Sequence, residues 1–192
     1  MKPTALFLIP LLFIAPLCRA ETGIDHLFSL DLGYSVTGLL NQGWGIGASY
    51  EKKLLNYLSV KGTMGHMTFL TGIRDIYCTS VNISLFVNYY PFGNGLDKLY
   101  IGLGSGGDFM HYFGSGEVPI NAGDVLISLT PRMGWKWTIS TYCMVDISAG
   151  YKVVAGDDFS YRGIKDYTKT GPQFGLSFKL FFEEIFKKRR EK

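Results

Sequence analysis

The sequence predicts an all-β fold, an eight-stranded antiparallel up-and-down transmembrane β-barrel, and three observations lead to it. Apolar residues alternate with small or polar ones in about eight segments, each of roughly the ten-residue length with which a tilted strand crosses a bilayer. The apolar face carries no charged residue, and the other face is rich in Gly, Ser and Thr. The aromatic residues of the apolar face gather near the strand ends, as they do at the two interfaces of a membrane.

Alternation by itself does not say which face points outward. A soluble sandwich or a lipocalin-type barrel also alternates, with its apolar face turned inward, and this is the alternative fold. A soluble exterior would be crowded with Lys and Glu, whereas the polar face of this chain is poor in charge. The net charge of +3 is small and does not suggest a nucleic-acid-binding surface.

The first twenty residues have the features of a secretory signal peptide. Lys2 precedes the apolar run Ala5–Leu17, and Ala20 provides a small residue for cleavage before Glu21. The run is too short to cross a bilayer as a helix, which needs about 20 residues. A lipoprotein with Cys18 as the lipidated residue is the alternative. We expect a signal peptide over residues 1–20, an outer-membrane β-barrel over 21–182 and a charged C-terminal tail over 183–192.

The first half of the chain holds four of the expected strands. In the first of them, Phe28, Leu30, Leu32, Tyr34 and Val36 form the apolar face, and small or polar residues lie between them. The next three repeat the pattern. These four strands cover residues 28–37, 43–51, 58–65 and 77–89.

The second half continues the alternation to the end of the barrel. Its strands cover residues 99–109, 125–139, 145–153 and 173–182. If the mature chain starts in the periplasm, turns near Lys52, Gly93 and Ser140 lie on that side. The outer loops then cover residues 39–41, 65–75, 111–123 and 154–169, and three of the four are long, as is typical of outer-membrane barrels.

The outward aromatic residues fall at two levels of the expected barrel. Those near the periplasmic turns are Tyr50, Tyr89, Trp135 and Trp137. Those near the outer loops are Trp44, Tyr77, Phe109 and Phe174. We expect these residues to form the two interfacial girdles around an apolar band.

Two stretches resemble the small OmpA/OmpX-type and OmpW-type outer-membrane barrels. The segment 89–93 followed by 99–104 is similar to a turn and the following strand of many such barrels. The last strand is similar to their assembly signal, which its residues Gln173, Gly175, Phe178 and Leu180 would supply. The resemblance implies a location in the outer membrane of a diderm bacterium, contact with outer-membrane lipid, and insertion by the barrel-assembly machinery.

The inward face of the expected barrel carries charges of both signs. An eight-stranded barrel is narrow enough for side chains to fill it, and an isolated charge there is costly, so we expect ion pairs. Lys136 and Asp146 flank the turn near Ser140 and should face each other across one hairpin. The alternative is that these groups line a permeation path. The expected interior charges are Asp31, Lys61, Asp108, Arg132, Lys136, Asp146, Lys152 and Lys179.

Cysteine and histidine positions suggest no chemistry. Cys78 and Cys143 begin strands that run in opposite directions, so we expect them at opposite ends of the barrel, too far apart for a disulfide. His66 and His111 lie near the outer rim with Asp108, and Ser115 follows in the same loop as His111. Nothing in their spacing brings a nucleophile, a base and an acid together. No spacing suggests a metal site, and we expect no cofactor.

The function that we expect is that of a non-enzymatic barrel whose surface loops meet the environment or a host ligand. The loop over residues 154–169 is rich in charge and Tyr, which suits a binding surface. A narrow channel for small or hydrophobic solutes is the first alternative, favoured by the many inward glycines. A lipid A-modifying barrel enzyme is the second.

Overall fold

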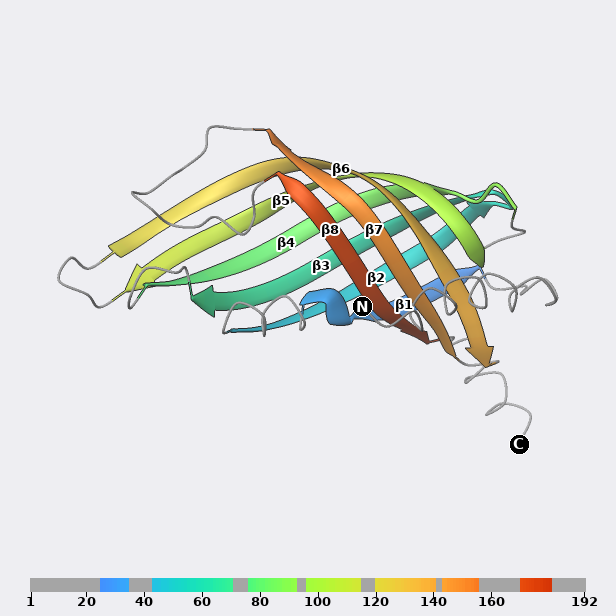
Figure 1. Ribbon diagram of the computed structural model, residues 1–192, viewed down its shortest axis with the longest axis horizontal. Helices are drawn as coiled ribbons and strands as arrows, with labels where there is room; N and C mark the ends of the chain where they lie inside the picture. Colours follow the sequence, from blue (N-terminus) through green and yellow to red (C-terminus); the bar gives the residue numbers. More distant parts are fainter. Residues whose placement is uncertain are drawn as a thin grey trace, which may run out of the picture.

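The computed structural model is a closed β-barrel of eight antiparallel strands in up-and-down order, so the expected number of strands and their order are confirmed (Figure 1). Each strand pairs with its neighbours in sequence, and β1 pairs with β8 to close the ring. The structure describes residues 25–34, 43–70, 76–92, 96–114, 120–140, 143–155 and 170–180. The expected signal peptide over 1–20 and the charged tail over 183–192 lie outside the described residues.

The strands differ widely in length. Figure 1 shows β4, β5 and β6 reaching farther than β7 and β8 at one end of the barrel. The bounds are β1 His26–Asp31, β2 Trp44–Leu55, β3 Leu58–Leu70, β4 Ile76–Tyr89, β5 Lys98–Gly114, β6 Ile120–Ser140, β7 Cys143–Ala155 and β8 Gly171–Leu180.

Two of the expected outer loops were placed wrongly, because much of each is strand. Residues 65–70 belong to β3, and residues 111–114 and 120–123 belong to β5 and β6. The inward face becomes apolar at this end, with Met67, Phe69, Met110 and Tyr112 buried inside. The contrast between apolar and polar residues is therefore lost there, although the strands continue.

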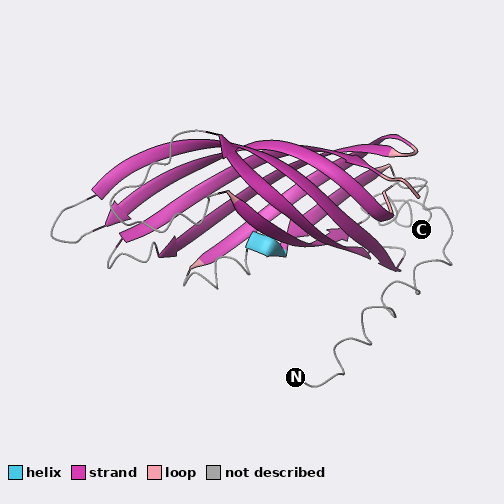
Figure 2. Ribbon diagram, turned by 45° about the horizontal axis from the view of Figure 1, so that its top comes forward, coloured by secondary structure: helices cyan, strands magenta, loops and turns pink. Residues whose placement is uncertain are grey.

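The first strand is shorter than the alternation predicts. β1 ends at Asp31, and Leu32–Tyr34 form a helical turn (Figure 2). Tyr34 was expected on the outward apolar face, but its ring lies inside the barrel against Gly47 and Gly65. A Cβ at either glycine would overlap that ring, so the bare backbone of β2 and β3 makes room for it. The remainder of the expected strand, residues 35–37, lies outside the described part of the chain.

The inward glycines also provide space for aromatic side chains of the adjacent strands. Phe86 lies directly opposite Gly104, and Tyr100 lies directly opposite Gly134. A Cβ at Gly104 would overlap the Phe86 ring, and one at Gly134 would lie 2.5 Å from the Tyr100 ring. Aromatic rings thus cover cross-strand glycines and fill the narrow lumen.

The cysteines lie at opposite ends of the barrel, as expected. Cys78 pairs in register with Phe69 and Tyr112, whereas Cys143 pairs with Ser140 and Leu180. Within the described residues, no disulfide joins the two. No helix in the described ranges has the length and hydropathy needed to cross a bilayer.

Candidate functional site: the charged barrel interior

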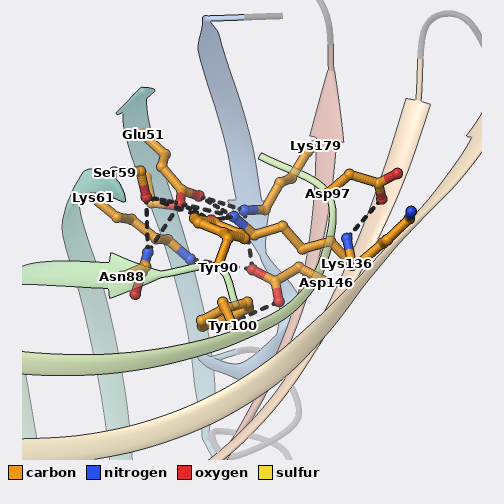
Figure 3. A network of polar contacts seen from close by, with 12 residues as sticks. Glu51, Ser59, Lys61, Asn88, Tyr90, Asp97, Tyr100, Lys136, Asp146 and Lys179 are labelled. Carbon is orange, nitrogen blue, oxygen red and sulfur yellow. Dashed lines mark hydrogen bonds and ion pairs between the residues drawn. The ribbon is translucent and has the colours of Figure 1, made fainter. Parts of the chain in front are cut away.

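The buried carboxylate of Glu51 is the centre of a network of polar contacts inside the barrel (Figure 3). It lies on β2 at an odd-numbered position, and the odd-numbered residues of this strand face inward. Lys136 Nζ lies 2.7 Å from both of its carboxylate oxygens, and Lys179 Nζ lies 2.8 Å from one of them. The hydroxyl groups of Tyr90 and Ser59 donate to the carboxylate at 2.5 and 2.6 Å. Groups from opposite walls therefore meet at one level and span the lumen.

Asp146 is the second buried carboxylate of this level. Its Oδ2 lies 3.0 Å from Lys179 Nζ and 3.8 Å from Lys61 Nζ, and the Tyr100 hydroxyl donates to Oδ1 at 3.0 Å. Asp146 is opposite Lys136 in register, as expected from the hairpin. The ion pair expected between them is replaced, because Lys136 reaches across the lumen to Glu51.

Arg132 has an aromatic partner as well as a polar one. Its guanidinium carbon lies 3.5 Å from the centroid of the Phe86 ring, a cation–π contact. Its Nη2 donates to Asn88 Oδ1 at 3.0 Å, and Asn88 Nδ2 donates in turn to Glu51 at 2.9 Å. Arg132 is thereby linked to the carboxylate of Glu51 through a neutral amide.

A second polar group lies nearer the loops expected outside. Lys152 Nζ contacts Asp108 Oδ2 in a buried ion pair. Asn82 Nδ2 donates to Asp108 Oδ1 at 2.8 Å, and the Tyr34 hydroxyl donates to Asn82 Oδ1 at 2.7 Å. Asp31, at the end of β1, lies 3.8 Å from Lys61 Nζ and so belongs to the group around Glu51 and Asp146.

The end of the barrel near the 90–97 turn is packed with apolar side chains. Leu27, Tyr90, Leu96, Tyr100 and Met144 form one buried cluster there. In the same turn, burial raises the pKa of Asp97 above its usual value, although the backbone N–H of Lys98 donates to its carboxylate at 2.8 Å. The opposite end holds the second apolar cluster, whose members include Met67, Phe69, Met110 and Tyr112. Packed apolar layers thus bracket the charged layers.

Sequence reasoning named eight interior charges and missed Glu51. The structure brings together Asp31, Lys61, Lys136, Asp146 and Lys179 around it, places Arg132 beside it, and pairs Asp108 with Lys152. The signal that could have found Glu51 was its parity, since it continues the inward series of Gly45, Gly47 and Ser49.

The candidate catalytic residues are not brought together. The His66 ring packs against Trp44 at a tilt, with ring centroids 4.9 Å apart, and the His111 ring stacks on Phe113 with centroids 6.2 Å apart. Both contacts are with residues of the outward face, whereas Asp108 points into the barrel. Ser115 lies outside the described residues. In the described ranges, no group of three His, Cys, Asp or Glu side chains could hold a metal ion.

The expected girdle aromatics lie on the outer surface toward the strand ends. Trp44, Tyr77, Phe109 and Phe174 are exposed in the halves of their strands nearest the expected outer loops. Tyr50 and Tyr89 are exposed toward the other end, and half-buried Trp135 and Trp137 lie beside each other there, with centroids 6.2 Å apart. Tyr57, which the sequence did not predict as part of this girdle, packs edge-on against Tyr89, with ring centroids 6.1 Å apart.

The expected assembly-signal residues Gln173, Gly175, Phe178 and Leu180 all lie on β8. Phe178 and Leu180 pair in register with Leu30 and Phe28 of β1. These positions put the last strand at the seam that closes the barrel.

Comparisons with known proteins show a similarity of fold. No protein-family model and no curated protein matches the chain. Among solved structures, the chain is similar to the N-terminal β-barrel domain of Pseudomonas aeruginosa OprF, with 8% sequence identity and a TM-score of 0.48. The match covers 83% of this chain and 98% of that one. Likeness at this level carries no argument about location or function.

Proposed function

We propose that the protein is an integral β-barrel of the outer membrane of a diderm bacterium, which acts through its surface loops and neither catalyses a reaction nor conducts solutes. The observation that carries the proposal is the inverted polarity of the barrel. Buried lysines and carboxylates fill its inside, and large apolar side chains cover its outside. A soluble barrel has the opposite arrangement.

The apolar exterior extends around the whole ring. Every strand contributes at least one large apolar side chain that is about half exposed or more. They include Leu30, Ile46, Met64, Ile83, Leu85, Ile101, Leu103, Ile127, Met133, Ile147 and Phe174. Soluble monomers rarely expose a continuous apolar surface of this extent, whereas lipid favours it. A closed barrel also satisfies the backbone hydrogen bonds that lipid cannot provide.

The filled interior supports a role without conduction. The ion pairs between Glu51, Lys136 and Lys179 join opposite walls, and all three side chains are fully buried. A hydrated ion or solute would have to separate these groups to pass, and breaking buried ion pairs is costly. The narrow-channel function is therefore the less favoured candidate.

The proposed partners follow from this arrangement. Outer-membrane lipid covers the apolar belt, and the barrel-assembly machinery recognises the β8 residues Gln173, Gly175, Phe178 and Leu180. A host or environmental ligand binds at the end where β4, β5 and β6 extend past β7 and β8. The two sequence motifs support a small barrel of the OmpA/OmpX-like or OmpW-like type.

Heat-modifiability tests the membrane-barrel proposal. The protein is extracted in detergent and run on a gel with and without boiling, beside a sample transferred to detergent-free buffer. We expect faster migration before boiling and precipitation without detergent. A β-rich protein that stays monomeric and soluble without detergent would mean that the exterior is not a membrane surface.

Two further measurements separate the candidate functions. In planar bilayers we expect no reproducible conductance steps from the purified protein, and regular steps would favour the channel. Lipid A isolated from cells that express the protein should have an unchanged mass. A new lipid A species would identify a lipid-modifying enzyme.

A further inference from the structure

The sequence and the structure assign different positions to the residues that follow β1. The alternation of Phe28 and Leu30 continues through Leu32 and Tyr34, which predicts a strand with these side chains facing outward. In the structure, the chain leaves the wall after Asp31, and Tyr34 enters the lumen. Both arrangements would stabilise the barrel, because the first extends the wall of the barrel and the second fills its lumen.

The wall offers a position for a longer β1. β2 begins at Trp44, but β1 pairs with it only as far as Ala48, and β8 begins at Gly171, but β1 pairs with it only from Ser177. If the observed register continued, Leu32 would lie opposite Ile46 and Leu176.

The same register would place Tyr34 between two aromatic residues of the outer surface. It would lie opposite Trp44 on β2 and opposite Phe174 on β8. Trp44 is 55% exposed and Phe174 is 80% exposed, so both would gain a cross-strand aromatic neighbour at the expected membrane interface. The side chains of the extended strand are therefore complementary to their neighbours on both sides.

In its observed position Tyr34 also has specific contacts. Its ring fills the space above Gly47 and Gly65, and its hydroxyl donates to Asn82. Gly33 remains beside β8, since a Cβ added there would lie 3.5 Å from the Phe174 carbonyl oxygen and 3.6 Å from the Leu176 nitrogen. The turn therefore already lies beside the β8 backbone with which an extended β1 would pair.

We propose that Leu32–Tyr34 is a two-position element: Tyr34 either closes the outer half of the lumen, or joins an extended β1 and leaves the space above Gly47 and Gly65 open. In the lumen Tyr34 has the hydrogen bond to Asn82 and the contacts with two glycines, and in the extended strand it would gain backbone pairing and two aromatic neighbours, so each position has contacts that stabilise it. The ion pairs around Glu51 lie in a different layer and stay in place, so the motion opens a pocket and not a continuous pore.

The two glycines of β3 provide a matched pair of variants. In Gly65→Val the added side chain overlaps the Tyr34 ring of the lumenal position, whereas a Cβ at Gly62 meets no atom within 4 Å. Both changes insert the same residue into the same strand. Asn82→Ala is a second variant that adds no atoms and removes the hydrogen-bond acceptor of Tyr34.

The experiment follows the Tyr34 ring with 3-fluorotyrosine at that position, by ¹⁹F NMR of the purified protein in lipid nanodiscs that contain spin-labelled lipid. In the wild type and in Gly62→Val, we expect a main resonance that the spin label does not broaden. In Gly65→Val and Asn82→Ala, the resonance should shift and broaden, and the amides of residues 33 and 34 should become protected from hydrogen exchange. Saturation at the shifted frequency should reduce the main wild-type resonance.

Three outcomes would overturn the proposal. The Tyr34 label could stay shielded from lipid in both biased variants, the amides could lose protection instead of gaining it, or the wild type could show no saturation transfer. If Gly65→Val does not fold, Asn82→Ala decides. Because the inference rests on the proposed membrane location, a label at Tyr151, which is 50% exposed on β7, is the reference. If spin-labelled lipid fails to broaden that label, the membrane location is what fails.

Discussion

Glu51 shows how much of this interior depends on one residue. Five side chains contact its carboxylate directly: Ser59, Asn88, Tyr90, Lys136 and Lys179. Two of them are lysines with no exposed surface. A buried ammonium group is tolerated only when a carboxylate neutralises it. Losing Glu51 would therefore leave two buried ammonium groups without this negative charge.

Glu51→Gln should therefore lower the free energy of unfolding by about 3–5 kcal/mol, because the glutamine keeps the size and removes the charge. The control is Asp25→Asn, since Asp25 pairs with Lys53 at 3.9 Å through a side chain that is 62% exposed. Loss of such a surface pair costs less than about 1 kcal/mol. Urea unfolding in lipid vesicles measures both, and equal small losses would contradict the central role of Glu51.

The Asp108–Lys152 pair permits a test of coupling between two charges. Lys152→Met removes the positive charge beside the buried Asp108 carboxylate, to which the neutral Asn82 amide still donates, so we expect a loss of about 3–5 kcal/mol. In the double variant Asp108→Asn/Lys152→Met the uncompensated charge is gone, and most of that loss should be recovered. A double-mutant cycle on unfolding free energies measures this, and additive losses would show that the two groups do not interact.

At the scale of the element, each strand has an inward and an outward face with different requirements. β4 shows this along its whole length, since Ser80 and Asn88 are buried inside and Ile83, Leu85 and Val87 are exposed outside. The period of two follows directly from strand geometry, so the sequence predicts it well. The end of a strand is different, because β1 stops at Asp31 although its alternation continues.

Depth along the outward face should control the cost of an added charge. Ile83→Arg changes an isoleucine that is 50% exposed in the middle of β4, whereas Ile139→Arg changes one that is 60% exposed next to the end of β6. In a membrane, the first should cost about 2–4 kcal/mol and the second about 0–1 kcal/mol. Unfolding in vesicles measures the difference. Similar small effects at both positions would argue that the outer face contacts water.

At the scale of the whole molecule, the barrel has one short seam. β1 and β8 pair through four residues on each side, from Phe28↔Leu180 to Asp31↔Ser177, whereas β4 and β5 pair through fourteen. Closing the ring pairs the edge strands with each other, but among the described residues β1 and β8 have the fewest residue pairs in register of any two neighbouring strands.

Hydrogen exchange should reveal the seam. We expect the amides of β1 and of residues 177–180 to exchange faster than the amides of β4 and β5, because opening the short ladder exposes less of the barrel. Exchange followed by mass spectrometry of the intact protein in detergent measures this order. Uniform protection of all eight strands would mean that the barrel opens only as a whole.

The sequence by itself determined the number of strands, their alternating faces and the charged character of the interior. These properties depend on local spacing, because successive side chains of a strand point to opposite sides whatever the rest of the chain does. Lys136 and Asp146 illustrate this, since their hairpin register was correct.

Only the tertiary structure decided which charges pair and where β1 ends. Lys136 pairs with Glu51, which is 85 residues away, because ring closure brings β2 and β6 within reach of each other across the lumen. Tyr34 turns inward because Gly47 and Gly65, on two other strands, leave space for its ring. The first result depends on the distance between opposite walls, which strand number and tilt set, and the second depends on side-chain volume on neighbouring strands. No local pattern encodes either of them.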